Sequence, residues 1–251
     1  MVNQPQNVPV SKNCFWLFIK ITIAEICLVL LIWYLTRPVY SIAPEAARRA
    51  QSKYNLYSMG IALHLYHDAH RILPPEAPVT ESGIPYHSWQ TQILPYMGEA
   101  VLYSKINFAK PWNDPSNQEF FRENLEVFLN RTIHDKNSNA KDSLGAYGIS
   151  HYVGNELVLK KNQFSRLTDI KDGMSNTIMA LETAEDFQPW GDPTFLADPM
   201  HIIGPDKKTS QRDGNHILLG DNSVRFISKD IDPEILKALS TPDGGEEVGE
   251  Y

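Results

Sequence analysis

The strongest constraint on this chain is an apolar run close to its N-terminus. Residues 15–35 read FWLFIKITIAEICLVLLIWYL, and such a run extends about 31 Å as a helix, close to the thickness of a bilayer's hydrocarbon core. A cleaved signal peptide usually has a shorter apolar region, and the small residues at 41–43 are followed by Pro44. The run therefore predicts a retained transmembrane helix over 15–35, preceded by a short tail over 1–14.

Two ionisable side chains interrupt the apolar run. Lys20 lies near enough to the N-terminal end to reach the membrane interface. Glu25 falls near mid-membrane, where an ionised carboxylate costs roughly 2.5–3.5 kcal/mol. Either Glu25 is protonated, or it pairs with Lys20 of a neighbouring helix. Lys20 and Glu25 are therefore the candidate helix–helix contacts in the membrane.

Charge and cysteine usage bound the remainder of the chain. Residues 38–251 carry 20 basic and 29 acidic side chains, with no basic stripe interleaved with aromatic residues, so nucleic acid is not an expected partner. Arg37 and the basic residues after it favour a cytoplasmic C-terminal domain by the positive-inside rule. The only cysteines, Cys14 and Cys27, lie in or beside the apolar run, which excludes a disulfide framework or thiolate zinc site in the later part.

Beyond Pro38 the pattern is helical first. Pro44 suits the first turn of a second helix, which should end at the prolines at 74–75. Its apolar residues recur at spacings of three and four and predict a buried stripe, formed by Leu56, Met59, Leu63 and Tyr66. Shorter helices are expected within 88–106, and a capping box at 116–119 predicts a helix whose buried face would be Phe121, Leu125 and Phe128.

Strand patterns dominate the later part of the chain. The candidates are 146–153, 176–183 and 216–227, the last of which predicts a hairpin across GlyAspAsnSer. Helices followed by strands indicate the α+β class. We expect one α+β ectodomain over 38–240 and an acidic, flexible tail over 241–251.

Several blocks of sequence resemble one family. They include EAARRAQSKYNLYSMGIALHLYHDAH, SWQTQILPY, TDIKDGMSNTIMALE, DNSVRFIS and LSTPDGGE, and together they are similar to the family catalogued as domain of unknown function 1559. The resemblance implies a build like that of a type IV pilin or pseudopilin. In this build one long N-terminal helix, half transmembrane and half soluble, packs on an antiparallel β-sheet with additional helices. It also implies a globular part outside the cytoplasmic membrane, against the charge bias, and no enzymatic activity.

The chain departs from the family's usual pattern at informative positions. A prepilin peptidase site requires a glycine, and none precedes Gly60, so we expect a divergent member that stays permanently anchored. Gln211 stands at the position of a usual histidine, and Asp221 and Asn222 stand at the positions of a usual AspGly. A cysteine that usually precedes the central loop is replaced by Asn130 or a neighbour.

A group of histidines on the second predicted helix raises the possibility of zinc. His64 and Asp68 are four residues apart, so both can reach one ion from the same helix face. A single helix supplies at most two good ligands on one face, and the alternative is a solvated or hydrogen-bonded flank.

Oxygen-rich turns raise the possibility of calcium. The candidate ligands are Asp169, Asp172, Asp221 and Asn222. Calcium takes six to eight oxygen ligands, whereas Asp and Asn in turns often hydrogen-bond their own backbone instead. We expect no cofactor, with calcium as the alternative.

No catalytic residue is expected. Ser150 lies beside His151, but the surrounding sequence lacks the second glycine of a nucleophile elbow, and adjacent residues of a strand point to opposite faces. We therefore expect a non-enzymatic, pilin-like structural or interaction protein of the cell envelope. It would cross the cytoplasmic membrane once, with its C-terminal domain outside, and its partners would be membrane lipid and sister pilin-like subunits. The alternative is an envelope module that binds calcium or a polysaccharide.

Overall fold

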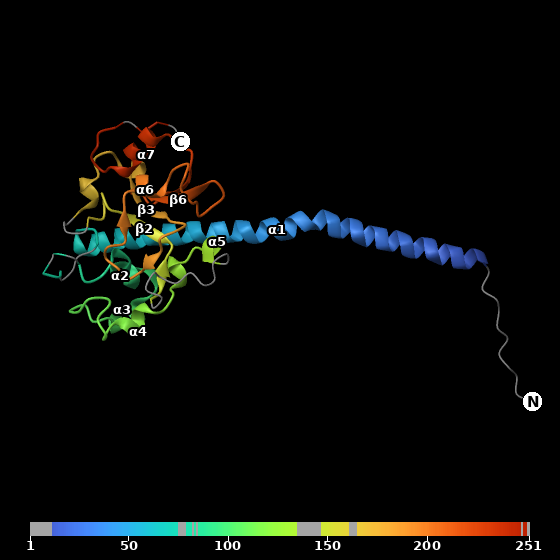
Figure 1. Ribbon diagram of the computed structural model, residues 1–251, viewed down its shortest axis with the longest axis horizontal. Coiled ribbons are helices and arrows are strands. Elements are labelled where there is room, and N and C mark those ends of the chain that lie inside the picture. Colours follow the sequence, from blue (N-terminus) through green and yellow to red (C-terminus); the bar gives the residue numbers. More distant parts are fainter. Residues whose placement is uncertain are drawn as a thin grey trace, which may run out of the picture. The chain divides into compact units, whose positions relative to one another are not determined.

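The structure is a computed structural model (Figure 1) that divides the chain into two units, Met1–Ala47 and Arg48–Tyr251. It describes residues 12–74, 79–81, 83, 85–134, 147–160, 165–246 and 248–249, without the side chains of 12–19, 35–44 and 134. Each unit is described separately below.

The first unit consists of the N-terminal part of helix α1, which spans Lys12–His70. Every described side chain from Lys20 to Tyr34 is exposed. In the described part of the chain, no helix has the length and apolar character needed to cross a membrane. The predicted span also includes residues 15–19 and 35, whose side chains lie outside the described set.

The predicted interruption between two helices is wrong, because α1 is continuous through Pro38 and Pro44. Proline fixes φ near a helical value, but inside a helix it removes one backbone hydrogen bond and crowds the carbonyl four residues earlier, so the helix continues through it at a cost of about 3 kcal/mol. In the second unit, the predicted apolar stripe from Leu56 to Tyr66 is confirmed as buried. The helix ends before the prolines, because Arg71 adopts a left-handed φ of 65° and donates its N–H to the carbonyl of His67 at 2.7 Å.

Short helices follow α1, and one predicted boundary is wrong. Their bounds are α2 Trp89–Ile93, η1 Leu94–Met97, α3 Ala100–Lys105, α4 Gln118–Phe121, η2 Glu126–Phe128 and α5 Arg131–His134. The predicted capping box at 116–119 does not form, since Ser116 bonds to Asp114 and Asn117 occupies the cap position of α4. The predicted buried residues Phe121, Leu125 and Phe128 are buried, but they do not share one helix, because Phe121 ends α4, whereas Leu125 is the N-cap residue of the η2 turn and Phe128 is its last residue.

The second unit contains a five-stranded sheet and a two-stranded one. The strands are β1 Ile149–Ser150, β2 Tyr152–Asn155, β3 Ile178–Glu182, β4 Gln188–Pro189, β5 Leu196–Ala197, β6 Gly214–Leu219 and β7 Val224–Ser228. The larger sheet has the order β5-β2-β3-β6-β7, and β1 pairs with β4. The predicted hairpin is confirmed as β6–β7. The sheet is not purely antiparallel, because β5 pairs with β2 in parallel.

The larger sheet separates two hydrophobic cores, which confirms the α+β class. On one face, Tyr152, Ala180 and Leu218 pack with the buried stripe of α1. On the other face, Val153, Leu181 and Ile217 pack with helices α6 (Pro199–Ile202) and α7 (Pro233–Ser240), which lie beside the sheet in Figure 1. The remaining elements are the short turns η3 Leu167–Asp169 and η4 Met174–Asn176. Alternation along a strand thus directs neighbouring residues into different cores, except at the register shift in β3, where Met179 and Ala180 share one core.

Candidate functional site

A buried carboxylate lies at the end of β3, on the α1 side of the sheet. Glu182 is fully buried and accepts hydrogen bonds from five residues that come from different parts of the chain. The donors are the hydroxyls of Ser52 and Ser210, Asn130 Nδ2 (3.2 Å), Gln211 Nε2 (3.0 Å), His216 N (2.8 Å) and His216 Nδ1 (3.1 Å). We call Glu182 and these five residues the carboxylate cluster.

The carboxylate cluster includes two positions that the sequence analysis marked as departures from the family. Asn130 and Gln211 both donate an amide N–H to Glu182. No motif or periodicity in the sequence indicates a role for Glu182, Ser52 or His216. The signal that could have indicated the cluster was the single acidic residue that ends the apolar strand IMALE.

The electrostatics of the cluster favour an ionised Glu182. Burial alone would raise the pKa of the Glu182 carboxyl. The hydrogen bonds and the charge of His216, together with the hydrogen bond from Ser210, outweigh burial and lower this pKa below its ordinary value of 4.5. Burial and the nearby Glu182 charge in turn raise the pKa of Tyr152, whose hydroxyl bonds to Ser52 at 2.8 Å.

The geometry of the cluster suits a structural connection. A nucleophilic serine needs a base that takes its proton and access to a substrate. Here the Ser52 and Ser210 hydroxyls are buried and both donate to Glu182. The cluster therefore links α1 with β3 and β6 through hydrogen bonds to a charged acceptor, which are stronger than those between neutral groups.

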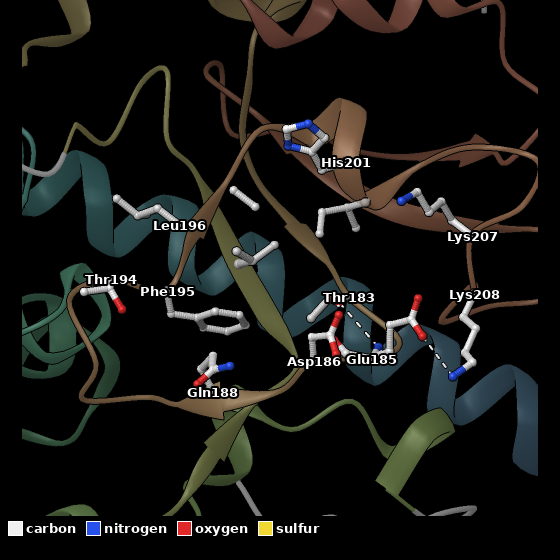
Figure 2. Close-up of a pocket in the computed structure, with 13 residues that line it drawn as sticks. Thr183, Glu185, Asp186, Gln188, Thr194, Phe195, Leu196, His201, Lys207 and Lys208 are labelled. Carbon is white, nitrogen blue, oxygen red and sulfur yellow. Dashed lines mark hydrogen bonds and ion pairs between the residues drawn. The ribbon is translucent and has the colours of Figure 1, made fainter. Parts of the chain in front are cut away.

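A second polar arrangement lies on the opposite face of the sheet, one residue further along. Thr183 helps to line a hollow of about 380 Å³ between β2, β5, the segment that follows β3, and α6. Figure 2 shows the Phe195 ring among the lining residues, with Lys207 and Lys208 on one side and Thr194 on the other. The volume is in the range of small-ligand sites. We call this feature the Phe195 hollow.

Some polar groups around the Phe195 hollow are already engaged. Lys208 forms an ion pair with Glu185 at 2.8 Å, and Glu185, helped by Asp186, raises the pKa of the Lys208 ammonium. Thr183 Oγ1 donates to the carbonyl of Glu185 at 2.8 Å. Within the described ranges, the side chains of Lys207, His201, Asp186 and Gln188 form no hydrogen bond and no ion pair.

The candidate zinc ligands His64 and Asp68 both lie on α1. His64 Nε2 lies 2.8 Å from the carbonyl oxygen of Gly220, and Asp68 is exposed. No three His, Cys, Asp or Glu side chains gather around a possible metal position among the residues that the structure describes. Zinc binding stays a prediction.

The candidate calcium ligands make turn and backbone contacts. Asp169 accepts from the backbone of Arg166 at 2.8 Å, Asp221 accepts from that of Ser223 at 2.9 Å, and Asn222 has a left-handed φ of 69°. Asp172 accepts from two backbone N–H groups at 244 and 245, which holds the beginning of the tail that was expected to be flexible. Residues 247 and 250–251 lie outside the described set. Calcium binding also stays a prediction.

The other predicted residues belong to neither arrangement. Lys20 and Glu25 are exposed on α1, so their membrane contacts stay a prediction. Ser150 Oγ donates to the carbonyl of Tyr152 at 3.0 Å, whereas His151 Nδ1 accepts from the backbone of Asn130 at 2.8 Å. Ser150 and His151 therefore engage different partners.

Comparison with known proteins gives one match. The family model described as "Protein of unknown function (DUF1559)" matches residues 42–211, which is more than half of the chain. No curated protein and no solved structure matches.

Proposed function

Since the chain belongs to the family of proteins of unknown function DUF1559, we propose that it is a membrane-anchored, pilin-like interaction protein of the cell envelope and not an enzyme. The observation that carries the proposal is the exposed apolar surface of α1. Ten large apolar side chains between Ile21 and Tyr34 are each 47–70% exposed. Leaving them in water costs on the order of 10 kcal/mol, at about 1 kcal/mol for each half-exposed side chain. Lipid contact would remove this cost.

A second exposed stripe on α1 supports the interaction role. Tyr54, Tyr57, Ile61 and Leu65 are 63%, 45%, 38% and 44% exposed, and they recur at spacings of three and four on the side of the helix opposite the buried stripe. A narrow apolar stripe of this kind is typical of helix pairing. We call these four residues the outer stripe.

The occupant that we propose for the outer stripe is a second copy of the chain. Two copies anchored in one membrane carry their outer stripes at the same distance in sequence from the anchor, so each outer stripe can meet the same residues of its neighbour. Shared anchoring also raises the effective concentration of one stripe near the other. The sister subunits of our proposal would therefore contact each other through Tyr54 and Tyr57.

Alkaline extraction of bacterial membranes tests the anchor. We expect the full-length chain to remain in the membrane pellet and Leu30→Lys to release a large part of it, because a lysine in the middle of an apolar span is costly. Val101→Lys is the matched control, since Val101 is 71% exposed on α3, and it should stay in the pellet. Release of the unchanged chain would refute the anchor.

Cross-linking in the same membranes tests the outer stripe. Lys53 is exposed beside Tyr54, so an amine-reactive reagent should give a dimer of the unchanged chain. Tyr54→Glu should reduce the dimer several-fold, because like charges would face each other across the pair, whereas Val101→Glu should not. An equal dimer yield in both variants would exclude this surface.

Side-chain labelling in intact cells tests the proposed orientation. The Arg212 side chain is 85% exposed, so the thiol in Arg212→Cys should react with a membrane-impermeant reagent if the second unit lies outside the cytoplasm. Labelling only after cell lysis would place that unit inside, as the positive-inside rule predicts.

A further inference from the structure

The floor of the Phe195 hollow is apolar and preformed. Val153 on β2 and Ala197 on β5 belong to neighbouring parallel strands and line the hollow, with Val153 buried and Ala197 partly buried. Phe195 directly precedes β5 and is only partly buried. An apolar floor that includes a partly exposed aromatic ring can receive the C–H face of a ligand.

The rim of the hollow offers polar groups of three kinds. Lys207 and His201 present donors, Asp186 presents a carboxylate acceptor, and Gln188 presents both a donor and an acceptor. In the part of the chain that the structure describes, these four side chains have no hydrogen-bond or ion-pair partner. Lys208, by contrast, is already paired with Glu185. Among the described residues, two charged groups beside the hollow therefore stay unpaired, the Lys207 ammonium and the Asp186 carboxylate.

We propose that the Phe195 hollow binds a sugar residue that carries a carboxylate, as part of an acidic polysaccharide. A sugar ring has an apolar C–H face for Phe195 and hydroxyls that can both donate to and accept from Asp186 and Gln188. Its carboxylate would pair with Lys207, with His201 as a further donor. A purely apolar ligand would leave the rim groups unsatisfied. A small inorganic anion would not use the aromatic floor.

This inference is independent of the membrane anchor, since none of the lining residues lies in α1. Calorimetry on the full-length chain in detergent micelles tests it, with a trisaccharide of galacturonic acid as the acidic probe and maltotriose as the neutral one. We expect the acidic probe to bind with a Kd of about 1 mM, which is ordinary for one sugar ring in an open site. Binding should weaken when salt is raised, because the contact includes an exposed ammonium.

Variants locate the site. Lys207→Gln should raise the Kd for the acidic trisaccharide about tenfold, as expected for loss of a hydrogen bond to a charged group. Lys105→Gln is the matched control, because Lys105 is exposed on α3 outside the hollow, and it should leave the Kd unchanged. The proposal is overturned if the acidic probe gives no heat at millimolar concentration. Equal affinity for the two probes, or equal Kd values for the two variants, would also overturn it.

Discussion

Glu182 and Thr183 are neighbours in the sequence, yet they face opposite sides of the sheet and belong to very different polar arrangements. Glu182 is buried and accepts hydrogen bonds from five residues, which come from α1, β6 and two loops. Thr183 faces a hollow in which several polar side chains have no protein partner within the described ranges. The difference arises from strand geometry, because successive side chains alternate between faces.

Buried polar groups with hydrogen-bond partners stabilise a fold, whereas exposed polar groups without protein partners are available to a ligand. A buried carboxylate is tolerated when its charge is matched by hydrogen bonds, and removing its partners is then costly. Exposed groups around an apolar floor lose little when they are unpaired, since water satisfies them. We therefore expect substitutions in the carboxylate cluster to change stability and substitutions at the Phe195 hollow to change binding.

The sharpest test of the comparison is Glu182→Gln beside Glu185→Gln. Glu182→Gln should lower the free energy of unfolding by about 3–5 kcal/mol, because the new amide presents N–H groups to donors that lose their acceptor. Glu185→Gln removes only an exposed ion pair with Lys208 and should cost far less. Urea unfolding of the full chain, followed by tryptophan fluorescence, measures both. Equal losses would remove the distinction between the two arrangements.

Among the described residues, the buried histidine His87 has no counter-charge, unlike Glu182 in the carboxylate cluster, so its effect on stability should depend on pH. Burial lowers the pKa of His87 from 6.5 to about 4, against the opposing effect of the Lys110 and Asn107 carbonyls. Between these pH values the unfolded chain binds a proton that the folded chain does not bind. The free energy of unfolding should therefore fall as the pH falls, by about 2 kcal/mol from pH 7 to pH 5.

Replacement of His87 separates its contribution from those of the other histidines. His87→Gln can still donate to the Lys110 carbonyl, and it should show a pH dependence of unfolding smaller by that amount. His201→Gln replaces an exposed histidine and should keep the full pH dependence. The interpretation fails if His87→Gln loses stability with falling pH as steeply as the unchanged chain does.

The smallest predicted effect concerns the helix side of the carboxylate cluster. Ser52→Ala removes one hydroxyl donor to Glu182 and should cost about 1–2 kcal/mol, since a charged group loses one of its hydrogen bonds. Ser58→Ala lies on the same helix, is partly exposed, and should leave the free energy of unfolding nearly unchanged. A similar loss in both variants would indicate helix propensity instead of the cluster.

Local patterns predicted much of this fold. The buried stripe from Leu56 to Tyr66 and the β6–β7 hairpin followed from periodicity and turn chemistry, and the family followed from several short blocks. Boundaries were less accurate. The capping box at 116–119 failed because Ser116 bonds to Asp114 instead of to the helix, a competition between alternatives that the sequence does not rank.

The two polar arrangements could not be predicted, because they depend on long-range pairing. Ser52 and Glu182 are 130 residues apart, and no periodic pattern relates them. The Phe195 hollow combines segments around 153, 183, 195 and 207, and the first three meet because β2 pairs with both β3 and β5. Sequence reasoning instead selected clusters of His and Asp that lie close along the chain, such as His64 and Asp68, and these do not form a metal-ligand group among the described residues.

Two features of α1 fix its rotation about its own axis. Ser52 bonds to Glu182, and at Gly60 any side chain would collide with Asn222 Oδ1 and Leu218 Cδ1. An α-helix turns by about 100° per residue, so a shift of the helix by one residue would break the first contact and create a collision at the second. The direction in which Tyr54 and Tyr57 point is therefore locked by the sheet, and every copy of the protein presents these two rings at the same angle.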